Sequence, residues 1–386
     1  MPVVLPFFTR FKFLIVRWML SLCLVLPWAS TPVQAQVKRA PKDSTKKVTF
    51  AAIPMPNYNR SFGFMLGVMG SMYYKVSPKD TLSPSSSTML MGMYSTSKTY
   101  MALGVQQFYL REDRWRLKLV GGTGEIFFQY FQGLPNLPPP VGEVYDGGIW
   151  VDFTTNTQFL VLDARRRVLP KLYVGGLFNA QWATTVYDIE NPLTGELPSK
   201  SANMMSVGYS MLYDSRDNVN YPTNGYFIQF KNSFIREALG ATSDYNQYEI
   251  AANNFWDIKK NSNTILVSRI YANIADGDVP FQGQNFIGRD DLRGYSQGKY
   301  RGDQVYAIQA ELRQHLYKRF GMVAFLGVGT AVDQLQDLSE APVLPSVGAG
   351  LRYRMIPSEK INIGLDVGVG REDWSLTFRI GETFGR

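Results

Sequence analysis

The sequence has few of the residues that disulfide frameworks and most catalytic sites require. Its 386 residues include one cysteine, Cys23, and one histidine, His315. Cys23 lies in an apolar stretch near the start of the chain, preceded by Leu22 and not by a small residue, which argues against a lipoprotein cleavage site. If that stretch is removed on export, no cysteine remains. Disulfides, thiol nucleophiles and cysteine metal sites are then excluded together.

Catalytic and metal chemistry have little support in what remains. A Ser-His hydrolase needs a serine and an orienting acid around its histidine, whereas His315 lies on a segment that we expect to be a strand lining a hydrated interior. Several aspartates gather near a long loop without the spacing of a calcium loop: Asp276, Asp278, Asp290, Asp291 and Asp303. We therefore expect no enzyme activity, no cofactor and no bound metal.

Long apolar runs and basic stripes are also scarce. After residue 35 no uninterrupted apolar run of about 18 residues occurs, and the mean hydropathy is -0.14. The 40 lysines and arginines and the 32 acidic residues form no basic stripe interleaved with stacking aromatics. These absences exclude a helical membrane protein and argue against nucleic acid as a partner.

The first residues have the pattern of a secretory signal peptide. A basic start is followed by the apolar run Trp18–Trp28, which is too short to span a bilayer comfortably. Val33-Gln34-Ala35 offers a cleavage site. We expect residues 1–35 to be removed, residues 36–47 to form a flexible periplasmic lead-in, and residues 48–386 to fold as one domain.

From Val48 onward, apolar and polar residues alternate in segments separated by turn residues. The clearest case is 360–370, where apolar residues at odd positions oppose asparagine, aspartate and glycine at even positions. In the last segment one face carries Leu376, Phe378, Ile380 and Phe384. Because successive strand residues point to opposite sides, each segment forms a strand with an apolar and a polar face.

Alternation alone fits a soluble β-sandwich as well as a membrane β-barrel. Two features favour the barrel. The polar faces are rich in Gly, Asn, Thr and Arg, which suit a hydrated lumen, and many segments reach the length of about 10 residues that a tilted strand needs to cross hydrocarbon. We predict a transmembrane antiparallel β-barrel of about sixteen strands, with the sixth strand over 148–163 and the last over 374–384.

One long loop contains an unusual arginine. If the N-terminus is periplasmic, the loops after odd-numbered strands face outward, and four of them are long: 132–147, 188–201, 275–302 and 334–344. The third is polar, glycine-rich and centred on Leu292-Arg293-Gly294-Tyr295. A solvated surface loop remains an alternative for this stretch taken alone. A loop that folds into the lumen explains the arginine better, since a guanidinium makes several charge-assisted hydrogen bonds to a fixed acceptor.

Three pieces of sequence resemble the bacterial surface antigen barrel of the BamA/TamA outer-membrane assembly superfamily. The first is the loop motif at 292–295, which stands between the eleventh and twelfth expected strands. The second is Asp214–Asn218 followed by Pro222–Tyr226, which is similar to that family's turn before the ninth strand. The third is the alternating C-terminal strand ending at Phe384, which is similar to the recognition signal of outer-membrane barrels. The resemblance covers roughly Val48 to Arg386.

The resemblance implies a partner for the loop arginine. In that family the arginine dips into the lumen and meets acidic groups on the following strands. Glu311 matches one such position and shares strand parity with Gln309 and Arg313, which places it toward the lumen. We expect Arg293 to pair with Glu311, and we expect charge reversal at both positions to restore what either single reversal damages.

The sequence departs from the family pattern in three places. The family's next strand usually contains Phe-x-Asp-x-Gly, whereas this chain has Phe325-Leu326-Gly327-Val328-Gly329 and so lacks one acceptor for Arg293. Residues Gly385-Arg386 extend past the terminal aromatic. Periplasmic POTRA repeats have no counterpart in the sequence, so the chain resembles a standalone barrel without POTRA domains.

The resemblance also implies a function. It predicts an integral outer-membrane protein that assists insertion or translocation of proteins or lipids through a weak seam between its first and last strands, without bond-making chemistry. The expected partners are outer-membrane lipid and either a periplasmic partner protein or client outer-membrane proteins. The alternative is a passive channel, or a structural barrel serving a larger periplasmic or surface complex.

Overall fold

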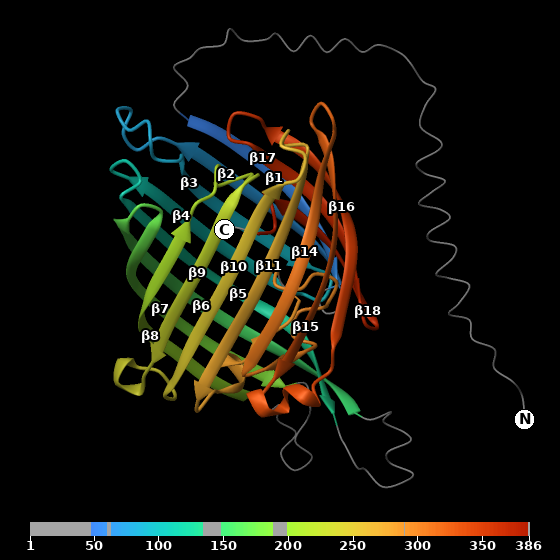
Figure 1. Ribbon diagram of the computed structural model, residues 1–386. Helices are drawn as coiled ribbons and strands as arrows, with labels where there is room; N and C mark the ends of the chain where they lie inside the picture. The colour runs from blue at the N-terminus through green and yellow to red at the C-terminus, as the bar shows by residue number, and fades with distance from the viewer. Residues whose placement is uncertain (1–47, 60–62, 134–147, 188–198, 289, 385–386) are drawn as a thin grey trace, which may run out of the picture. The chain divides into compact units, whose positions relative to one another are not determined.

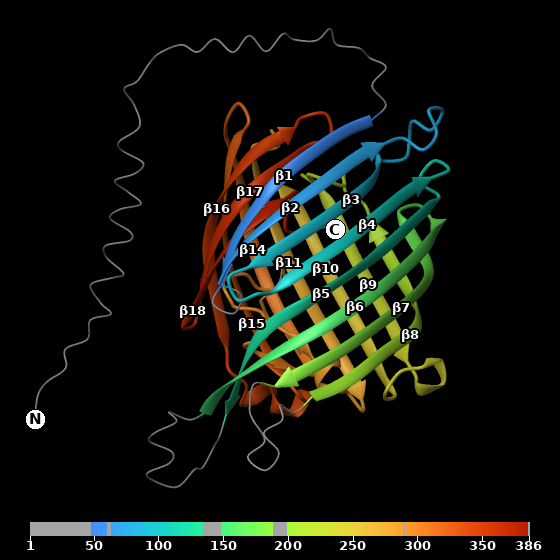
Figure 2. The same cartoon turned by 180° about the vertical axis from the view of Figure 1, so that it is seen from behind.

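The computed structural model describes residues 48–59, 63–133, 148–187, 199–288 and 290–384. Within these residues, sixteen long strands close into one antiparallel barrel, as the alternation predicted. Figures 1 and 2 show the tilted strands from opposite sides. The expected signal peptide (1–35) and lead-in (36–47) lie outside the described residues, as do the larger parts of two expected outward loops, at 134–147 and 188–198.

Each barrel strand pairs with its sequence neighbours, and β1 meets β18 to close the ring. The strands are β1 (Val48–Asn59), β2 (Gly63–Tyr74), β3 (Ser86–Ser95), β4 (Tyr100–Leu110), β5 (Trp115–Gly133), β6 (Gly148–Leu169), β7 (Leu172–Tyr187), β8 (Ser199–Asp214), β9 (Gly225–Ile235), β10 (Tyr245–Asp257), β11 (Thr264–Gly277), β14 (Gln304–Tyr317), β15 (Phe320–Val332), β16 (Leu344–Ile356), β17 (Ile361–Gly370) and β18 (Asp373–Ile380).

The remaining elements lie in the connections. Two short strands, β12 (Asn285–Phe286) and β13 (Arg301–Gly302), pair with each other between β11 and β14. The described connections also contain three 3-10 helices: η1 (Glu237–Leu239), η2 (Phe281–Gly283) and η3 (Leu335–Ser339). No helix in the described part of the chain is long and apolar enough to cross a membrane.

Strand β6 is longer than the sequence analysis predicted. It was expected to end at residue 163, before three consecutive arginines, but it continues to Leu169. The first of these arginines, Arg165, is buried and donates to the Ser210 hydroxyl at 3.0 Å, while the backbone N–H of Arg167 donates to the Arg114 carbonyl at 2.8 Å. Polar partners inside the barrel therefore let a cationic run continue a strand.

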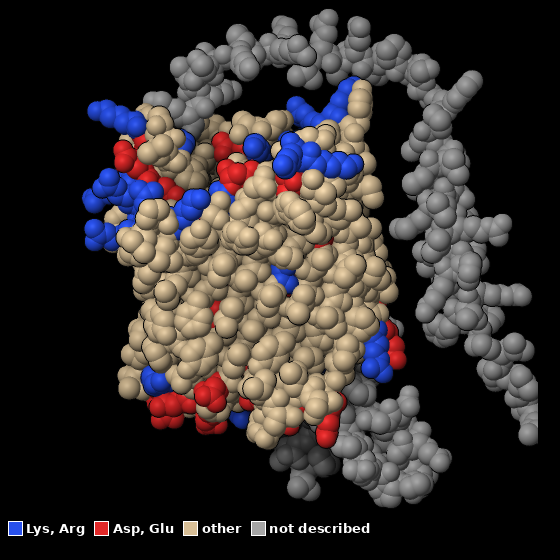
Figure 3. Space-filling view, in the orientation of Figure 1, with Lys and Arg blue, Asp and Glu red and all other residues tan. Residues whose placement is uncertain are grey.

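The two faces of the barrel wall differ in polarity. Large apolar side chains are exposed on the outside of many strands, including Trp256, Ile270, Ile308, Leu326, Val347 and Leu351. Figure 3 shows a largely uncharged band across one side of the barrel, with charged residues gathered at its two ends. An apolar belt of this kind faces lipid, whereas a water-soluble barrel would carry charge along its outer surface.

The seam between β1 and β18 is short. Among the described residues, two pairs join these strands, Tyr58 with Leu376 and Asn59 with Ser375, although β1 pairs with β2 along its whole length. The Tyr58 and Trp374 rings stack with 4.7 Å between their centres. From Val48 to Asn57 no residue of β1 pairs with β18 in the sheet. In this part of the seam the Phe378 backbone N–H donates to the Asn57 side-chain oxygen, and the two strands are otherwise joined by apolar packing.

The C-terminal strand leaves the wall earlier than predicted, and this corrects one expectation. β18 ends at Ile380, not at 384, because Gly381 adopts a φ of 79° and turns the chain inward. Phe384 does not share a lipid-side face with Leu376. Its side chain is 2% exposed and packs in an apolar cluster with residues of β7 to β11: Tyr173, Leu212, Tyr221, Phe227, Phe255, Ile265 and Val267.

Phe378 and Ile380, which were also predicted to share a face with Leu376, pack toward the lumen as well. Ile380 is buried, and Phe378 packs against the same lumen-side cluster as Ile53, Met55 and Met69 of β1 and β2. Alternation in β1 and β2 directs these three residues inward, since their neighbours Pro54 and Val68 are exposed on the outside. The end of β18 therefore runs inside the first two strands and does not continue beside them.

Candidate functional site

The motif Leu292-Arg293-Gly294-Tyr295 lies in the barrel lumen, on a floor of inward-facing glycines from β15 and β17. A Cβ atom on Gly327 or Gly329 would come within 3.0 Å of the Leu292 side chain, and one on Gly368 would lie 2.7 Å from the Gly294 backbone. Leu292 is fully buried as a result. Sequence alternation predicted polar inner faces for these strands. In the structure, the glycines on those faces leave room for the loop.

Hydrogen bonds fix the loop to the end of the barrel. The Tyr295 hydroxyl donates to the Pro345 carbonyl at 2.6 Å and accepts from the Arg371 backbone N–H at 2.9 Å. The Ser296 backbone N–H and hydroxyl donate to the two carboxylate oxygens of Asp373, at 2.7 and 3.0 Å. The loop is thus attached to β16, β18 and the turn before β18, the part of the barrel next to the seam.

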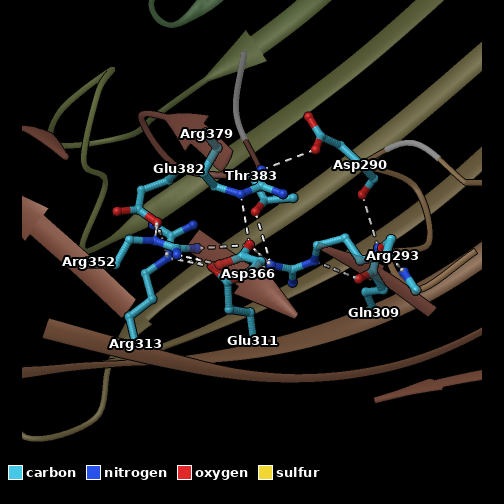
Figure 4. A network of polar contacts seen from close by, with 12 residues as sticks. Asp290, Arg293, Gln309, Glu311, Arg313, Arg352, Asp366, Arg379, Glu382 and Thr383 are labelled. Atoms are coloured by element: carbon cyan, nitrogen blue, oxygen red, sulfur yellow. Dashed lines mark hydrogen bonds and ion pairs between the residues drawn. The ribbon is translucent and has the colours of Figure 1, made fainter. Parts of the chain in front are cut away.

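Arg293 projects from this loop into a buried group of carboxylates. Its Nη1 lies 2.6 Å from Oε2 of Glu311 on β14 and 3.1 Å from Oδ2 of Asp366 on β17. Its guanidinium carbon lies 3.5 Å from the centre of the Phe325 ring, which adds a cation–π contact. Figure 4 shows the arginine and both carboxylates converging in the lumen. The ion pair expected from the sequence is present, together with a second carboxylate that was not expected.

The surrounding network contains four arginines and three buried carboxylates. Arg313 bonds Glu311 at 2.8 Å, Arg379 bonds Asp366 at 2.7 Å, and Arg352 contacts both Asp366 and Glu382. A fourth carboxylate, Asp290, is largely exposed and pairs with Arg379 at 3.1 Å. The charges nearly balance, which a buried ionic cluster requires, because an unpaired charge is costly in a region of low dielectric.

Asp366 replaces the acceptor that the family pattern places on β15. An aspartate at 327 has no room, because a Cβ atom there would lie 2.5 Å from the Gln309 side chain and 3.0 Å from Leu292. The carboxylate comes from two strands further along the barrel wall and reaches the same guanidinium. The missing acceptor inferred from the sequence is therefore supplied by another strand.

The C-terminal segment is part of the same network. Glu382 accepts from Asn362 at 2.6 Å and pairs with Arg352 at 3.2 Å, and the Thr383 hydroxyl accepts from Arg293 Nη1 at 3.1 Å. The guanidinium of Arg293 lies 5.4 Å from the Phe384 ring. The inward tail and the loop motif, which are 90 residues apart in sequence, thus hold each other in place.

The second family motif forms a turn at the opposite end of the barrel from the loop. Asp214 pairs with Arg116 at 2.6 Å and Arg216 at 2.7 Å, and Asp217 accepts from the backbone and hydroxyl of Thr223. The turn directs Tyr221 into the apolar cluster around Phe384. The polar residues of this motif therefore hold the turn that places Tyr221 inside this end of the barrel.

Sequence reasoning missed most of the residues that surround Arg293. Asp366, Arg313 and Arg379 were recognised only as members of polar strand faces, and Arg352 and Glu382 were not considered. The sequence also contained one indication of the short pairing between β1 and β18 that was not used. Pro54 and Pro56 lie in β1, and proline is found in sheets mainly on edge strands because it cannot donate to a ladder.

The groups considered for catalysis and metal binding are placed elsewhere. His315 bonds the Lys318 carbonyl at 3.0 Å in the turn between β14 and β15. Among the described residues, no group of three or more His, Cys, Asp or Glu side chains is arranged to hold a metal ion. Asp290 and Asp303 serve in contacts to Arg379 and Gln284.

Known proteins share this architecture. A model of the Omp85 superfamily domain matches residues 161–384, more than half of the chain. Among solved structures, BamA from Haemophilus ducreyi lacking POTRA domains 1-3 aligns with a TM-score of 0.55 at 11% identity, over 86% of this chain and 70% of that chain. No curated protein sequence matches the chain.

Two further solved structures align over most of this chain. CdiB from Acinetobacter baumannii has a TM-score of 0.55 at 12% identity, over 87% of this chain and 60% of its own. CdiB from Escherichia coli has a TM-score of 0.59 at 12% identity, over 87% and 62%. The chain thus spans less than two thirds of either CdiB chain, and these likenesses show the fold alone.

The family assignment rests on the domain match together with the geometry. The matched residues include the loop motif, the charged network and the C-terminal strand that carried the resemblance in the sequence. The apolar belt and closed barrel agree with an integral outer-membrane protein. The chain therefore belongs to the Omp85 superfamily.

Proposed function

We propose that this barrel assists the insertion or translocation of proteins or lipids at the outer membrane by opening the seam between β1 and β18. The observation that carries the proposal is the two-pair seam between Tyr58–Asn59 and Ser375–Leu376. Unpaired backbone groups on a strand edge are a template for another strand. Among the described residues, the seam has the fewest strand pairs of any neighbouring strands in the barrel, which favours separation at this position.

The prolines of β1 support the same proposal. Pro54 and Pro56 lack backbone N–H donors, so they cannot contribute bonds to a full ladder with β18. The buried loop and tail keep the neighbouring wall, β14 to β17, rigid through the Arg293 network. Movement at the seam therefore does not require unfolding of the rest of the barrel.

A disulfide across the seam tests the proposal. Tyr58→Cys with Leu376→Cys joins directly paired residues, in a chain whose single native cysteine, Cys23, is replaced by serine. The matched control is Val367→Cys with Leu376→Cys, which joins β17 to β18 inside a continuous ladder. Liposomes containing each variant are given a urea-unfolded eight-stranded outer-membrane barrel, or a fluorescent phospholipid whose flipping is followed by chemical quenching.

The expected result is loss of insertion or lipid flipping in the oxidised seam variant, with recovery on reduction and no loss in the control. Equal activity of the oxidised and reduced seam variant would rule out seam opening. The alternative, a structural barrel within a larger complex, predicts instead one stable stoichiometric partner in membrane pull-downs and no effect of the disulfide.

We also propose that residues 1–35 are an export signal, that residues 36–47 form a periplasmic lead-in and that the protein acts without enzymatic chemistry. The basic start, short apolar run and Val33-Gln34-Ala35 support the first point. N-terminal sequencing of the protein from isolated outer membranes should begin at Gln36. A mature protein that begins at Met1 would contradict cleavage.

A further inference from the structure

The lumen contains a chamber whose lining includes none of the four arginines of the charged network. Its volume is about 280 Å³, and it lies between the inner wall formed by β6 to β11 and the start of the loop that carries η2 and β12. Water takes up about 30 Å³ per molecule in the liquid. The chamber is therefore large enough for a small organic ligand and slightly below the usual size of drug-binding pockets.

Amide side chains dominate the lining of this chamber. They come from both the wall and the loop: Asn179, Gln181, Gln247, Asn273, Gln282 and Asn285. Gln247 Nε2 donates to Asn273 Oδ1 at 3.2 Å and to Asn285 Oδ1 at 3.0 Å, which connects the wall to the loop. An amide can donate two hydrogen bonds and accept two, so these contacts use only part of what the groups offer.

One of these amides has an unused acceptor. Gln282 Nε2 bonds the Thr185 hydroxyl at 3.2 Å and the Lys200 carbonyl at 2.8 Å, whereas its Oε1 is buried without a hydrogen-bond partner. Gln282 is therefore fixed to the wall through its nitrogen, and it connects the start of the loop to β7 and β8.

The chamber is almost uncharged. Asp291 is the single charged residue in its described lining, and no lysine or arginine lines it. A second lumen cavity, of about 160 Å³, has in contrast an excess of basic residues in its lining: Arg116, Lys118, Arg165, Arg216 and Lys231, with Asp163 and Glu249. An anionic ligand is therefore expected to prefer the second cavity, and the amide-lined chamber suits a neutral ligand.

Aromatic rings complete the lining. Phe159 of β6, Tyr271 of β11 and Phe286 of β12 enter it from the wall and from the loop. Aromatic rings bury large apolar surface and leave hydrogen bonding to the amides. A pyranose has these two properties together, since its C–H faces are apolar and its edge carries hydroxyls that both donate and accept.

We propose that this chamber binds a neutral saccharide of one or two rings, with Gln247 and Asn273 bonding its hydroxyls. The inference goes beyond seam opening and does not depend on it. A short peptide shares the capacity for amide hydrogen bonds, but it is usually recognised along an exposed edge or groove, whereas this chamber is compact and walled by the loop.

Saturation-transfer NMR on the full barrel in an amine-oxide detergent tests the proposal, because maltoside and glucoside detergents carry the competing sugar. The probes are glucose, N-acetylglucosamine and maltose, with glucose 6-phosphate as a charged comparison and triglycine as a neutral peptide. Gln247→Met and Asn273→Leu remove hydrogen-bonding groups with little change in volume. Gln107→Met, which lines the other cavity, is the matched control.

The expected result is transfer to at least one neutral saccharide, with affinity reduced roughly tenfold by Gln247→Met or Asn273→Leu and unchanged by Gln107→Met. Heat-modifiable mobility on gels confirms that each variant is folded. The proposal is overturned if the folded protein binds none of the neutral saccharides, if it binds triglycine or the phosphorylated sugar in preference, or if the chamber variants bind as tightly as the control.

Discussion

The pairing of Arg293 with Glu311 illustrates why a contact cannot be separated from its surroundings. Arg293 also faces Asp366, and Glu311 also faces Arg313. Reversing both charges would place a carboxylate beside Asp366 and a guanidinium beside Arg313. The double reversal expected from the sequence to restore function would therefore introduce two like-charge contacts, and its failure would say nothing about the original pair.

Neutral substitutions give a sharper test at this site. Glu311→Gln leaves four arginines around two buried carboxylates, whereas Arg293→Met leaves three arginines and three carboxylates. We expect Glu311→Gln to lower the free energy of unfolding by about 3–5 kcal/mol, and Arg293→Met by about 1–3 kcal/mol. Urea unfolding in detergent, followed by tryptophan fluorescence, measures both. The opposite order would show that the charge balance of the network does not set its stability.

The space under the loop gives a second prediction at the residue scale. Gly370 lies against the Tyr295 ring, where an added Cβ atom would come within 2.4 Å of ring carbon. Gly370→Ala should displace the loop and weaken its anchoring, with a cost of about 1–3 kcal/mol in unfolding free energy. Gly70→Ala, at a glycine with open space beyond its Cα, is the matched control and should be nearly neutral. Protease cleavage within 281–300 reports the release of the loop.

At the scale of elements, the sequence predicted what local periodicity controls. The alternation in 360–370 gave β17 to within a residue, and the motif at 292–295 was correctly placed inside the lumen. It could not show that Asp366 meets Arg293, because only closure of the barrel brings β17 to the loop. Nor could it show the course of Phe384, since an alternating pattern continues past Ile380 while the backbone turns at Gly381.

The C-terminal segment 381–384 turns into the lumen, and Phe384 can act either as an assembly signal or as part of the folded core. A substitution at Phe384 distinguishes these two roles. Phe384 fills an apolar cluster formed by β7 to β11, so Phe384→Ala should destabilise the assembled barrel by about 3–5 kcal/mol. Phe320→Ala, at an exposed aromatic of the barrel rim, is the control and should have little effect. If the terminal aromatic acts only as an assembly signal, Phe384→Ala will reduce the amount of barrel formed without changing the unfolding of what has formed.

The turn between β2 and β3, residues 75–85, is long for a connection at this end of a barrel, and Asp80 orders it. Its carboxylate accepts from the Ser83 hydroxyl at 2.6 Å and from the backbone N–H groups of Ser83 and Glu112. The Ser83 bonds lower the pKa of Asp80 to about 2. The folded pKa lies below the ordinary value of 3.8, so this stabilisation is complete above that value and is lost as the pH falls toward 2.

Pepsin, which is active in acid, provides the measurement. Leu82 is exposed at the tip of this turn. We expect cleavage there to increase as the pH falls from 3.8 toward about 2, and we expect Asp80→Asn to be cleaved across the whole range. A wild-type cleavage rate that follows only the pH activity of pepsin, measured on an unfolded peptide of the same sequence, would show that Asp80 does not hold the turn.

The whole molecule is divided into two sides. The wall from β14 to β18 carries the loop, the tail and the charged network, while the two lumen cavities described above are lined mainly by β2 to β11. The short seam between β1 and β18 lies next to the wall that carries the charged network. The end of β18 is bound through Arg379 and Glu382, whereas β1 pairs with β2 along its whole length. Opening of the seam would also have to separate the apolar cluster in which Ile380 of β18 packs with Ile53 and Met55 of β1.

The loop beside β14 to β17 is also expected to limit ion conduction through the lumen. The Ile287 backbone N–H donates to the Tyr300 carbonyl at 2.9 Å, so residues 288–299 can be replaced by a two-glycine linker without separating β12 from β13. We expect the wild-type barrel to show low conductance in planar bilayers, and the deletion to raise it several-fold because it empties the lumen beside β14 to β17. Replacing 335–341, in the exposed connection that contains η3, with the same linker is the control. Equal conductance of wild type and deletion would mean that the loop does not block the path, and the passive-channel alternative would then gain over seam opening.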